Sequence, residues 1–318
     1  MTEPVRIAVM GAADIARRRM LPAFAACPRT TVTAVASRDG AKARSLAHAY
    51  GCRPLHGYAA ALEDDETEAV YVALPAALHA EWTRAALLAD KHVLAEKPLA
   101  LGRNETAELH DLARSRGLAL MENVLFLHHS QHARARQLVR SGAVGRLHQF
   151  QAAFAVPRRP RSDIRYQAEL GGGALWDTGV YPVRAALLML GHPLRVVGAV
   201  SGRGPGDEVD TAGSALLSGP DGVAVHLSFG LDHGYRNVYE FWGSEGRLVV
   251  ERAFTPPADH TPVLRIERGG EVEEIRLTPE DQVANAVTAF AAAVRGGAAP
   301  SADGLRQAEL LDELAARR

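Results

Sequence analysis

The chain has 318 residues, of which 47% are hydrophobic and 23% charged, a composition that is typical of a folded globular protein and excludes a disordered one. Its formal net charge is −1, with 36 basic and 37 acidic residues, so no overall charge favours nucleic acid or an anionic membrane as a partner. Because a common domain has roughly 150 residues, the length predicts two domains.

The two cysteines, Cys27 and Cys52, are too few for a disulfide framework and match no zinc motif, so we expect free thiols. The N-terminal residues lack the basic and apolar regions of a secretory signal. No apolar run approaches the ~18 residues that a membrane-spanning helix requires. These observations predict a cytoplasmic protein without a membrane partner.

The first 120 residues alternate short β-branched runs with helical stretches such as 76–89 and 104–116. This alternation predicts a doubly wound parallel sheet, covered by helices on both faces and connected by right-handed crossovers. The fold class is therefore α/β in this part of the chain. The expected strands are Val5–Met10, Thr31–Ser37, Ala69–Leu74, His92–Glu96 and Leu118–Glu122.

Residues 121–318 follow a different pattern and predict a second domain, of the α+β class, with a largely antiparallel sheet. Strands separated by Gly, Pro and Asp turns dominate residues 195–277. The two helices that close the chain, 279–295 and 302–316, pack either in this domain or back on the first. Other expected elements are a helix at 132–141, a strand at Leu147–Ala155, a loop rich in Pro and Arg at 157–165, three glycines at 171–173 and a helix that follows them to about 190.

The first predicted strand ends at Gly11 and runs through a turn (GAADIA) into a helix. In dinucleotide-binding folds this turn presents backbone N–H groups and a helix N-terminus to the pyrophosphate. Only the first glycine of the G-x-G-x-x-G fingerprint is present; Ala13 and Ala16 take the other positions and are small enough for a close approach. Since the carboxylate of Asp14 would repel a pyrophosphate, we expect it to cap the helix instead.

The second predicted strand ends at Ser37 and Arg38. Sites that prefer NAD usually have Asp or Glu near this point, which accepts hydrogen bonds from the adenosine ribose. A guanidinium favours a 2′-phosphate instead, because it forms a charge-assisted hydrogen bond with it. This end of the strand therefore predicts NADP(H) as the cofactor.

Two further motifs indicate chemistry on a carbonyl group. The tripeptide Glu96-Lys97-Pro98 follows a predicted strand, where doubly wound folds bind their ligands. A lysine there polarises a carbonyl or donates a proton, if burial lowers its pKa. After the three glycines, Asp177 and Tyr181 stand four residues apart and share one face of a helix. A phenol, a carboxylate and a lysine are a suitable set for reducing a carbonyl.

Together these motifs resemble the glucose–fructose oxidoreductase/inositol dehydrogenase (Gfo/Idh/MocA) family, over nearly the whole chain. The local sequence is most similar to the deoxysugar 3-ketoreductases, which use NADPH to reduce the keto group at carbon 3 of a dTDP-linked hexose. Tyr181 stands where many family members have histidine, a departure that the ketoreductases share. The stretches that carry this similarity are Gly11–Ala16, Pro75–Trp82, Met121–His132, Asp177–Arg184 and Ala253–His260.

The resemblance implies that Lys97 donates a proton or polarises the carbonyl, with Tyr181 as its partner or as the alternative acid. It implies substrate contacts from both of these residues and from Asp177, and, on the sheet of the second domain, from Tyr235 and Thr255. The cofactor site that it implies is lined by Gly11, Ala12, Ala13, Asp14, Ile15, Ser37, Arg38, Tyr58, Leu74, Pro75, His79, Glu96, Lys97, Arg165 and Asp177.

Two other groups of residues admit alternatives. His128, His129 and His132 have helical spacing, but no carboxylate stands at ligand spacing, so we expect no metal. The four arginines of the loop at 157–165 are either solvated or bind a diphosphate of the substrate or cofactor. With one nearby aromatic residue, Tyr166, this loop does not resemble a nucleic-acid site.

These features predict an NADP-binding Rossmann domain at residues 1–120 and a domain for substrate binding and oligomerisation at 121–318. The predicted function is NADPH-dependent reduction of the carbon-3 keto group of a dTDP-linked keto-deoxyhexose, in deoxysugar and antibiotic biosynthesis. The alternatives are an NAD(P)-dependent oxidoreductase on a free sugar or inositol, and a non-catalytic sensor of NADP(H). An uncovered sheet face in the second domain would favour a homo-oligomer, a dimer or a tetramer.

Overall fold

The computed structural model describes residues 3–297 and 299–317. It divides into two compact units, Met1–Val124 with Val283–Leu305, and Leu125–Gln282 with Arg306–Arg318. The assignment of separate functions to residues 1–120 and 121–318 stays a prediction. Among the described residues, no helix is long and apolar enough to cross a membrane.

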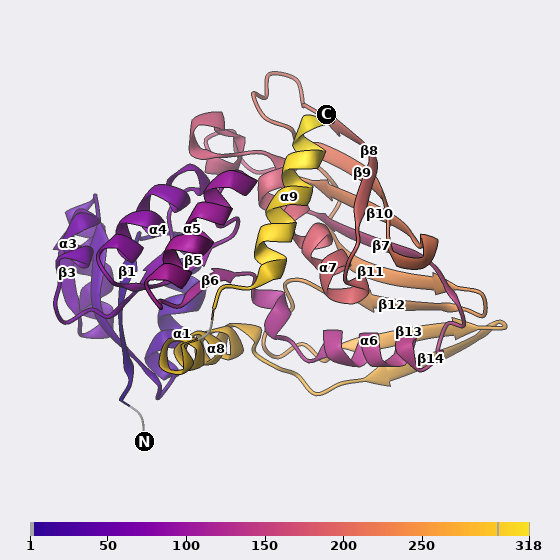
Figure 1. Cartoon of the computed structure of the whole chain (residues 1–318), viewed down its shortest axis with the longest axis horizontal. Coiled ribbons are helices and arrows are strands. Elements are labelled where there is room, and N and C mark those ends of the chain that lie inside the picture. The colour runs from indigo at the N-terminus through magenta and orange to yellow at the C-terminus, as the bar shows by residue number, and fades with distance from the viewer. Residues whose placement is uncertain (1–2, 298, 318) are drawn as a thin grey trace. The chain divides into compact units, whose positions relative to one another are not determined.

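The first unit (Figure 1) contains a six-stranded parallel sheet. Its strand order, β3-β2-β1-β4-β5-β6, confirms the predicted doubly wound fold. The strand order reverses between β1 and β4, the point outside which such sheets bind their ligands. The strands are β1 (Val5–Met10), β2 (Thr30–Ser37), β3 (Arg53–His56), β4 (Ala69–Val72), β5 (His92–Glu96) and β6 (Leu120–Asn123).

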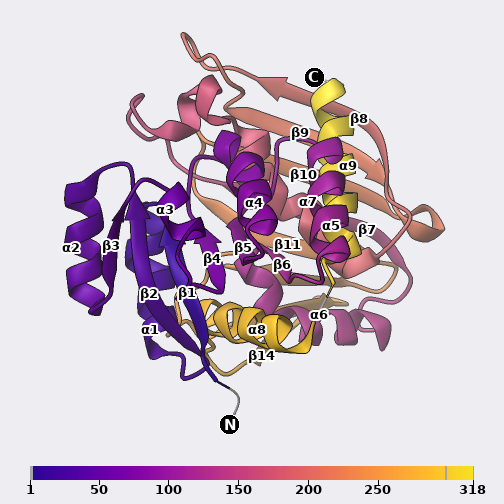
Figure 2. The ribbon, with the colours of Figure 1, turned by 60° about the vertical axis from the view of Figure 1, so that its left-hand side comes forward.

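Helices pack on both faces of this sheet because its strands are apolar on both sides. On one face, Met10, Val72 and Ala95 belong to a buried cluster with Leu87 of α4 and Leu109 of α5, two helices that lie side by side in Figure 2. On the other face, Tyr71 packs edge-on against a phenylalanine of α1. The helices of this unit are α1 (Leu21–Ala26), α2 (Gly40–Tyr50), α3 (Ala59–Leu62), α4 (His79–Leu88), α5 (Arg103–Ser115) and α8 (Gln282–Gly296).

Strand β3 was not expected from the sequence. It is short, it contains Pro54, and three of its four residues are exposed. It lies at the edge of the sheet, where a proline is tolerated because one side of the strand needs no ladder hydrogen bonds. A strand of this kind has no apolar pattern that a sequence could display.

The second unit contains an eight-stranded sheet in the order β14-β13-β12-β11-β7-β10-β9-β8. Every neighbouring pair is antiparallel except β7 and β10, so the prediction of a largely antiparallel sheet is confirmed. The strands are β7 (Leu147–Ala155), β8 (Arg195–Gly202), β9 (Ala212–Ser218), β10 (Ala224–Gly230), β11 (Arg236–Gly243), β12 (Arg247–Glu251), β13 (Val263–Arg268) and β14 (Glu271–Arg276).

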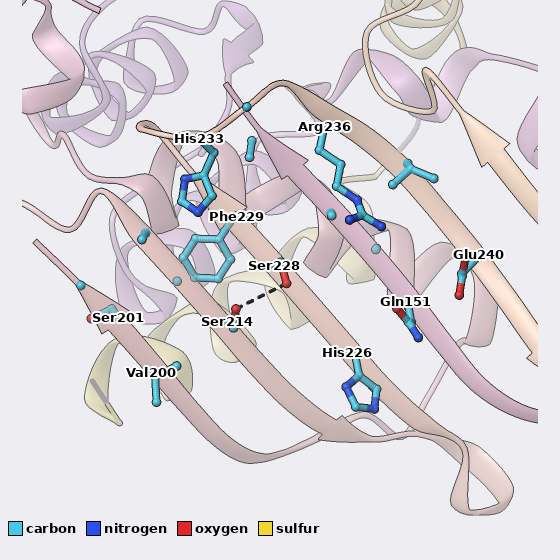
Figure 3. A pocket seen from close by; sticks show the side chains of 18 residues that line it. Gln151, Val200, Ser201, Ser214, His226, Ser228, Phe229, His233, Arg236 and Glu240 are labelled. Carbon is cyan, nitrogen blue, oxygen red and sulfur yellow. Dashed lines mark hydrogen bonds between the residues drawn. The ribbon is translucent and has the colours of Figure 1, made fainter. Parts of the chain in front are cut away.

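The two faces of this sheet differ. Phe150 and Phe154 of β7 are buried on the face that α7 packs against, whereas Gln151 and Ala153 alternate with them and line the other face, called the open face below (Figure 3). This period-2 alternation is the pattern of a sheet covered on one side. The helices of this unit are α6 (Gln131–Arg140), α7 (Val180–Leu190) and most of α9 (Ala302–Ala316).

Candidate functional site

The turn after β1 packs tightly on the end of β4. The amide of Gly11 donates to the carbonyl of Ala36 over 2.8 Å, and the amide of Ala73 donates to that of Met10 over 2.9 Å. Gly11 has φ of 107°, and a Cβ at this position would lie 2.2 Å from the carbonyl oxygen of Ala73. Only glycine fits here, so this turn is a cradle of bare backbone at the reversal point of the sheet.

The prediction that Asp14 caps the following helix is wrong. The carbonyl of Ala13 accepts the first helical hydrogen bond, from the amide of Arg17 over 3.0 Å, so Ala13 is the cap and Asp14 is the first helical residue. The Asp14 carboxylate lies 2.9 Å from the guanidinium of Arg17 and 3.6 Å from that of Arg18. These two arginines compensate the negative charge that the sequence places beside the turn.

After the end of β2, Arg38 is exposed and the carboxylate of Asp39 caps helix α2. Asp39 accepts hydrogen bonds from the amides of Ala41 and Lys42, over 3.0 and 3.2 Å, and so caps α2. The hydroxyl of Ser37 accepts from the amide of Asp39 over 3.1 Å. Arg38 is exposed. A carboxylate is therefore present near this strand end, but it serves the helix.

The exposed guanidinium of Arg38 lies over the ring of Tyr58, 5.9 Å from its centroid. The amide of Gly57 donates to the carbonyl of Ser37 over 3.0 Å. This bond holds Gly57, the residue before Tyr58, beside the end of β2. Tyr58 in turn packs edge-on against Trp82, with the ring centroids 5.1 Å apart. The structure thus brings together Ser37, Arg38 and Tyr58 of the predicted cofactor site. The cation–π contact with Tyr58 orients the guanidinium of Arg38.

A buried histidine connects the ends of β4 and β5. The Nδ1 atom of His79 lies 2.6 Å from the carbonyl oxygen of Pro98, and its Nε2 atom lies 2.8 Å from that of Leu74. Burial lowers the pKa of His79. A neutral imidazole has one N–H and donates to one of these two carbonyls, so the side chain lies between the end of β4 and the turn around Lys97 and supports that turn.

The strand end that leads to Lys97 is anchored through Glu96. One carboxylate oxygen of Glu96 accepts hydrogen bonds from the hydroxyl of Tyr71, over 2.6 Å, and from the amide of Asn123, over 2.7 Å. Burial, together with the charge of Glu96, raises the pKa of Tyr71 well above its usual value. The half-buried Lys97 follows directly, at the carboxyl end of β5. The hydrogen bonds of Glu96 therefore fix the backbone that leads into Lys97.

In the second unit, the glycines at 171–173 allow a helix to begin in a crowded place. A Cβ at Gly172 would lie 2.6 Å from the carbonyl oxygen of Arg165, and one at Gly173 would lie 2.6 Å from the carboxylate of Asp210. Asp210 accepts a hydrogen bond from the amide of Leu175 over 2.9 Å and so satisfies a donor at the helix start. A π-helical turn, Leu175–Gly179, then leads into α7.

This turn carries Asp177, and Tyr181 follows on the first turn of α7. The Nε atom of Arg165 donates to the carboxylate of Asp177 over 2.8 Å, while its Nη1 atom lies 3.0 Å from Asp163. Although burial opposes its charge, these two carboxylates raise the pKa of Arg165. Arg165 therefore holds Asp177.

Another arginine of the same loop, Arg158, is also paired. Its guanidinium lies 2.6 Å from Asp207 and 3.0 Å from Asp232, and 5.1 Å from the ring centroid of Tyr166. Two carboxylates and an aromatic ring therefore hold the guanidinium of Arg158 within this loop.

The ring of Tyr181 lies among three phenylalanine rings. Its centroid is 4.6 Å from that of Phe154, 5.7 Å from that of Phe254 and 6.2 Å from that of Phe126. Such packing fixes the direction of the phenol and surrounds its ring with apolar atoms.

The structure brings Tyr235 and Thr255 together. Their hydroxyl oxygens are 3.3 Å apart. The amide nitrogen of the buried Asn237 lies 2.9 Å from each of them. Sequence reasoning missed Asn237, as it missed Asp210. A polar residue on the inward-facing side of β11, in register with the buried Tyr239, was the available signal.

His129 and His132 contact other groups of the protein. The Nδ1 atom of His132 lies 2.9 Å from the hydroxyl of Tyr239, and burial lowers the pKa of His132 to about 3. The Nδ1 atom of His129 accepts from the amide of Gln131 over 3.2 Å and lies 3.4 Å from the carboxylate of Glu280. No set of three His, Cys, Asp or Glu side chains suited to a metal ion occurs within residues 3–297 and 299–317.

A hollow of about 620 Å³ lies on the open face of the eight-stranded sheet (Figure 3). Gln151, His226, Arg236 and Glu240 line it, and its lining contains none of the predicted catalytic residues. Figure 3 shows its floor crossing several strands, with a hydrogen bond between Ser214 and Ser228. Doubly wound folds bind their ligands beyond the carboxyl ends of the strands, whereas this hollow lies on a face of the eight-stranded sheet.

Comparison with known proteins identifies the family. A model of the oxidoreductase family with an NAD-binding Rossmann fold matches residues 5–124, and a model of the GFO/IDH/MocA C-terminal domain matches residues 132–249. This chain belongs to the GFO/IDH/MocA family. The family resemblance predicted from the motifs is confirmed.

Close relatives within the GFO/IDH/MocA family share about half of the sequence. A dTDP-3,4-didehydro-2,6-dideoxy-α-D-glucose 3-reductase from Saccharopolyspora spinosa is 53% identical over 93% of this chain and 90% of its own. One from Actinomadura kijaniata is 51% identical over 97% and 94%. A solved 3-ketoreductase from Actinomadura kijaniata, in complex with NADP and TDP-benzene, is 49% identical, with a TM-score of 0.97 over 99% of this chain and 98% of the other.

Proposed function

We propose that this protein is an NADPH-dependent ketoreductase that reduces the carbon-3 keto group of a dTDP-linked keto-deoxyhexose. The observation that carries the proposal is the similarity, at about half identity over nearly the whole chain, to curated 3-reductases of such sugars. In each unit, hydrogen bonds hold predicted site residues in place, Glu96 in the first and Asp177 in the second, as this activity would need.

The first unit fits the cofactor. The backbone cradle at Gly11, which a Cβ would fill, suits a pyrophosphate, and the turn around it includes Ala12, Ala13 and Ile15. The exposed Arg38 over Tyr58 would bind the 2′-phosphate through a charge-assisted bond. Bound NADPH supplies the hydride for the reaction. The backbone after β4, at Leu74 and Pro75, would border the cofactor.

Two side chains are proposed to provide the proton. Lys97 would polarise the carbonyl or donate a proton to the developing alkoxide, and Tyr181 would assist it or serve as the acid in its place. Asp177, held by Arg165, would orient the substrate. Tyr235 and Thr255 would contact the nucleotide sugar. Because His79 supports the turn that carries Lys97, this turn would lose little conformational freedom when the substrate binds.

We also propose that the protein is a homo-oligomer, a dimer or a tetramer, that buries the open face. Three apolar side chains on this face are exposed: Val200 by 69%, Trp242 by 53% and Leu216 by 39%. Apolar side chains gathered on one sheet face are typical of an interface, and a second copy of the same face is the simplest cover. A cytoplasmic location stays a prediction.

The experiment that tests the function measures NADPH consumption with a dTDP-3,4-diketo-2,6-dideoxyhexose. This labile substrate is generated in place from dTDP-4-keto-6-deoxyglucose by a 2,3-dehydratase. NADH, free sugars and inosose are run alongside. Rapid oxidation of NADPH with the nucleotide sugar alone supports the proposal. Turnover of a free sugar or inosose would replace it with the oxidoreductase alternative, and NADPH binding without any turnover would favour a sensor.

A further inference from the structure

Three buried amide side chains hold the backbone that follows β12. Gln131 donates to the carbonyl of Ala253 over 3.2 Å, and Gln282 donates to the carbonyl of Phe254 over 3.1 Å. The side-chain oxygen of Asn237 accepts from the amide of Phe254 over 2.7 Å. All three amides are at most 5% exposed. The next residue along the chain, Thr255, is therefore presented in one position.

The orientation of the Asn237 amide follows from its partners. The backbone N–H of Phe254 can only donate, so the atom of Asn237 that faces it must be the oxygen. The amide nitrogen then faces the hydroxyl oxygens of Tyr235 and Thr255, each 2.9 Å away. The backbone thus determines which way round this amide lies.

The orientation of the Asn237 amide determines where the hydrogens of the two hydroxyl groups can point. An amide nitrogen has two hydrogens, and Asn237 uses one for each hydroxyl oxygen. Both hydroxyls accept from Asn237, so neither can point its own hydrogen at it. The contact of 3.3 Å between them uses at most one hydrogen. Tyr235 is 51% exposed, so at least one hydroxyl hydrogen is available to a ligand.

We propose that Asn237 is a positioning residue that turns the hydroxyl hydrogens of Tyr235 and Thr255 away from itself, so that at least one of them donates to the diphosphate of the nucleotide sugar. This inference rests on the proposed function. The non-bridging oxygens of a diphosphate only accept hydrogen bonds, whereas the hydroxyls of a sugar and the N–H of thymine also donate. The keto and thymine carbonyl oxygens also only accept, but the diphosphate is the charged acceptor of the substrate, and a hydrogen bond to a charged oxygen is roughly twice as strong as one to a neutral oxygen. The diphosphate therefore best matches a hydroxyl hydrogen that is turned outward.

The test replaces Asn237 by an acid of the same shape. In Asn237→Asp, one carboxylate oxygen still accepts from the amide of Phe254, but the other accepts from the hydroxyls and turns their hydrogens inward. We expect the Kd of dTDP, measured by calorimetry, to rise at least about tenfold, the loss typical of a hydrogen bond to a charged group. The Kd of NADPH should stay within about twofold, and KM for the sugar should rise more than kcat falls.

A second background separates hydrogen-bond polarity from the added charge. The double variant Tyr235→Phe/Thr255→Val should itself lose at least about tenfold in dTDP affinity, and Asn237→Asp should then add less than about threefold. A full additional loss in this background, or dTDP binding equal to wild type in the double variant, would overturn the inference.

Gln282→Met serves as the structural control. It removes a hydrogen bond to the same backbone segment but leaves both hydroxyls facing Asn237. We expect a lower Tm and less than about threefold change in the Kd of dTDP. A loss as large as that of Asn237→Asp would reduce Asn237 to a merely structural role. If wild type binds no dTDP, the proposed function fails as well; if wild type and Asn237→Asp bind it equally, this inference alone fails.

Discussion

Lys97 differs from the other lysines in what surrounds it. The chain has three, Lys42, Lys91 and Lys97. Lys91 donates to the carbonyls of Asp64 and Thr67, over 2.9 and 2.6 Å, and so ties a loop to the sheet. Lys97 instead stands at a strand end where ligands of doubly wound folds bind. Lys91 and Lys97 therefore form a natural pair of test and control.

For Lys97→Met we expect kcat to fall by roughly 10²–10⁴-fold, because the carbonyl loses its proton donor or polarising charge. The Kd of NADPH should change less than about threefold in a fluorescence titration. Lys91→Met should lower the free energy of unfolding by about 1–3 kcal/mol, since two carbonyls lose their donor, and leave kcat unchanged. Turnover that survives in Lys97→Met would remove the role assigned to this residue.

Arg38 is expected to set the choice between NADPH and NADH. In Arg38→Ser, the KM of NADPH should rise by about tenfold or more because the 2′-phosphate loses a charge-assisted bond, while the KM of NADH stays nearly constant. Steady-state kinetics with both cofactors measure this. The exposed Arg29 provides a control, as Arg29→Ser should change neither value. Equal losses for both cofactors would contradict the assignment.

Helix α6 packs through a histidine whose pKa lies far below the ordinary value. Its residue His132 is buried against Tyr239 of β11, and burial, together with the nearby His129, lowers its pKa to about 3. The folded state therefore holds this side chain neutral, whereas the unfolded chain protonates near the ordinary value of 6.5. The stabilisation is complete above pH 6.5 and is lost as the pH falls from there towards about 3.

We expect the free energy of unfolding to fall by about 1.4 kcal/mol per pH unit over this range from His132 alone. Urea unfolding at several pH values between 7.5 and 5 measures the slope. His132→Gln should be less stable at neutral pH but lose this part of the slope, and the exposed His48→Gln on α2 should leave it unchanged. An unaltered slope in His132→Gln would show that other groups cause the acid sensitivity.

For the whole molecule, the proposed oligomer makes the open face an interface. Ala153 of β7 lines the hollow on this face, so Ala153→Arg would place a charge in the middle of the contact. We expect the mass of a dimer or tetramer for wild type and a smaller species for the variant, by light scattering on a sizing column. The control Leu88→Arg, at a 52% exposed residue of α4, should keep the wild-type mass. A monomeric wild type would contradict the proposal.

Much of the fold could be predicted because it depends on local patterns. Strands β1, β5 and β7 lie within the predicted bounds, since each shows buried apolar residues at the spacing of a strand. β3 escaped prediction because its stability comes from its neighbour in the sheet. The cap of the first helix was assigned to Asp14, because residue preference alone does not reveal that the carbonyl of Ala13 starts the helix.

The sequence by itself determined the fold class, the family and the residue types of the site, because periodicity and short motifs are local properties of a chain. The tertiary structure decided which of these residues act together. Arg165 holds Asp177, and Asn237 joins Tyr235 to Thr255, through hydrogen bonds between residues that different elements bring together. Asn237 and Asp210 carry no motif. Their roles exist only once the neighbouring donors are in place, because an amide or a carboxylate takes its function from the atoms that surround it.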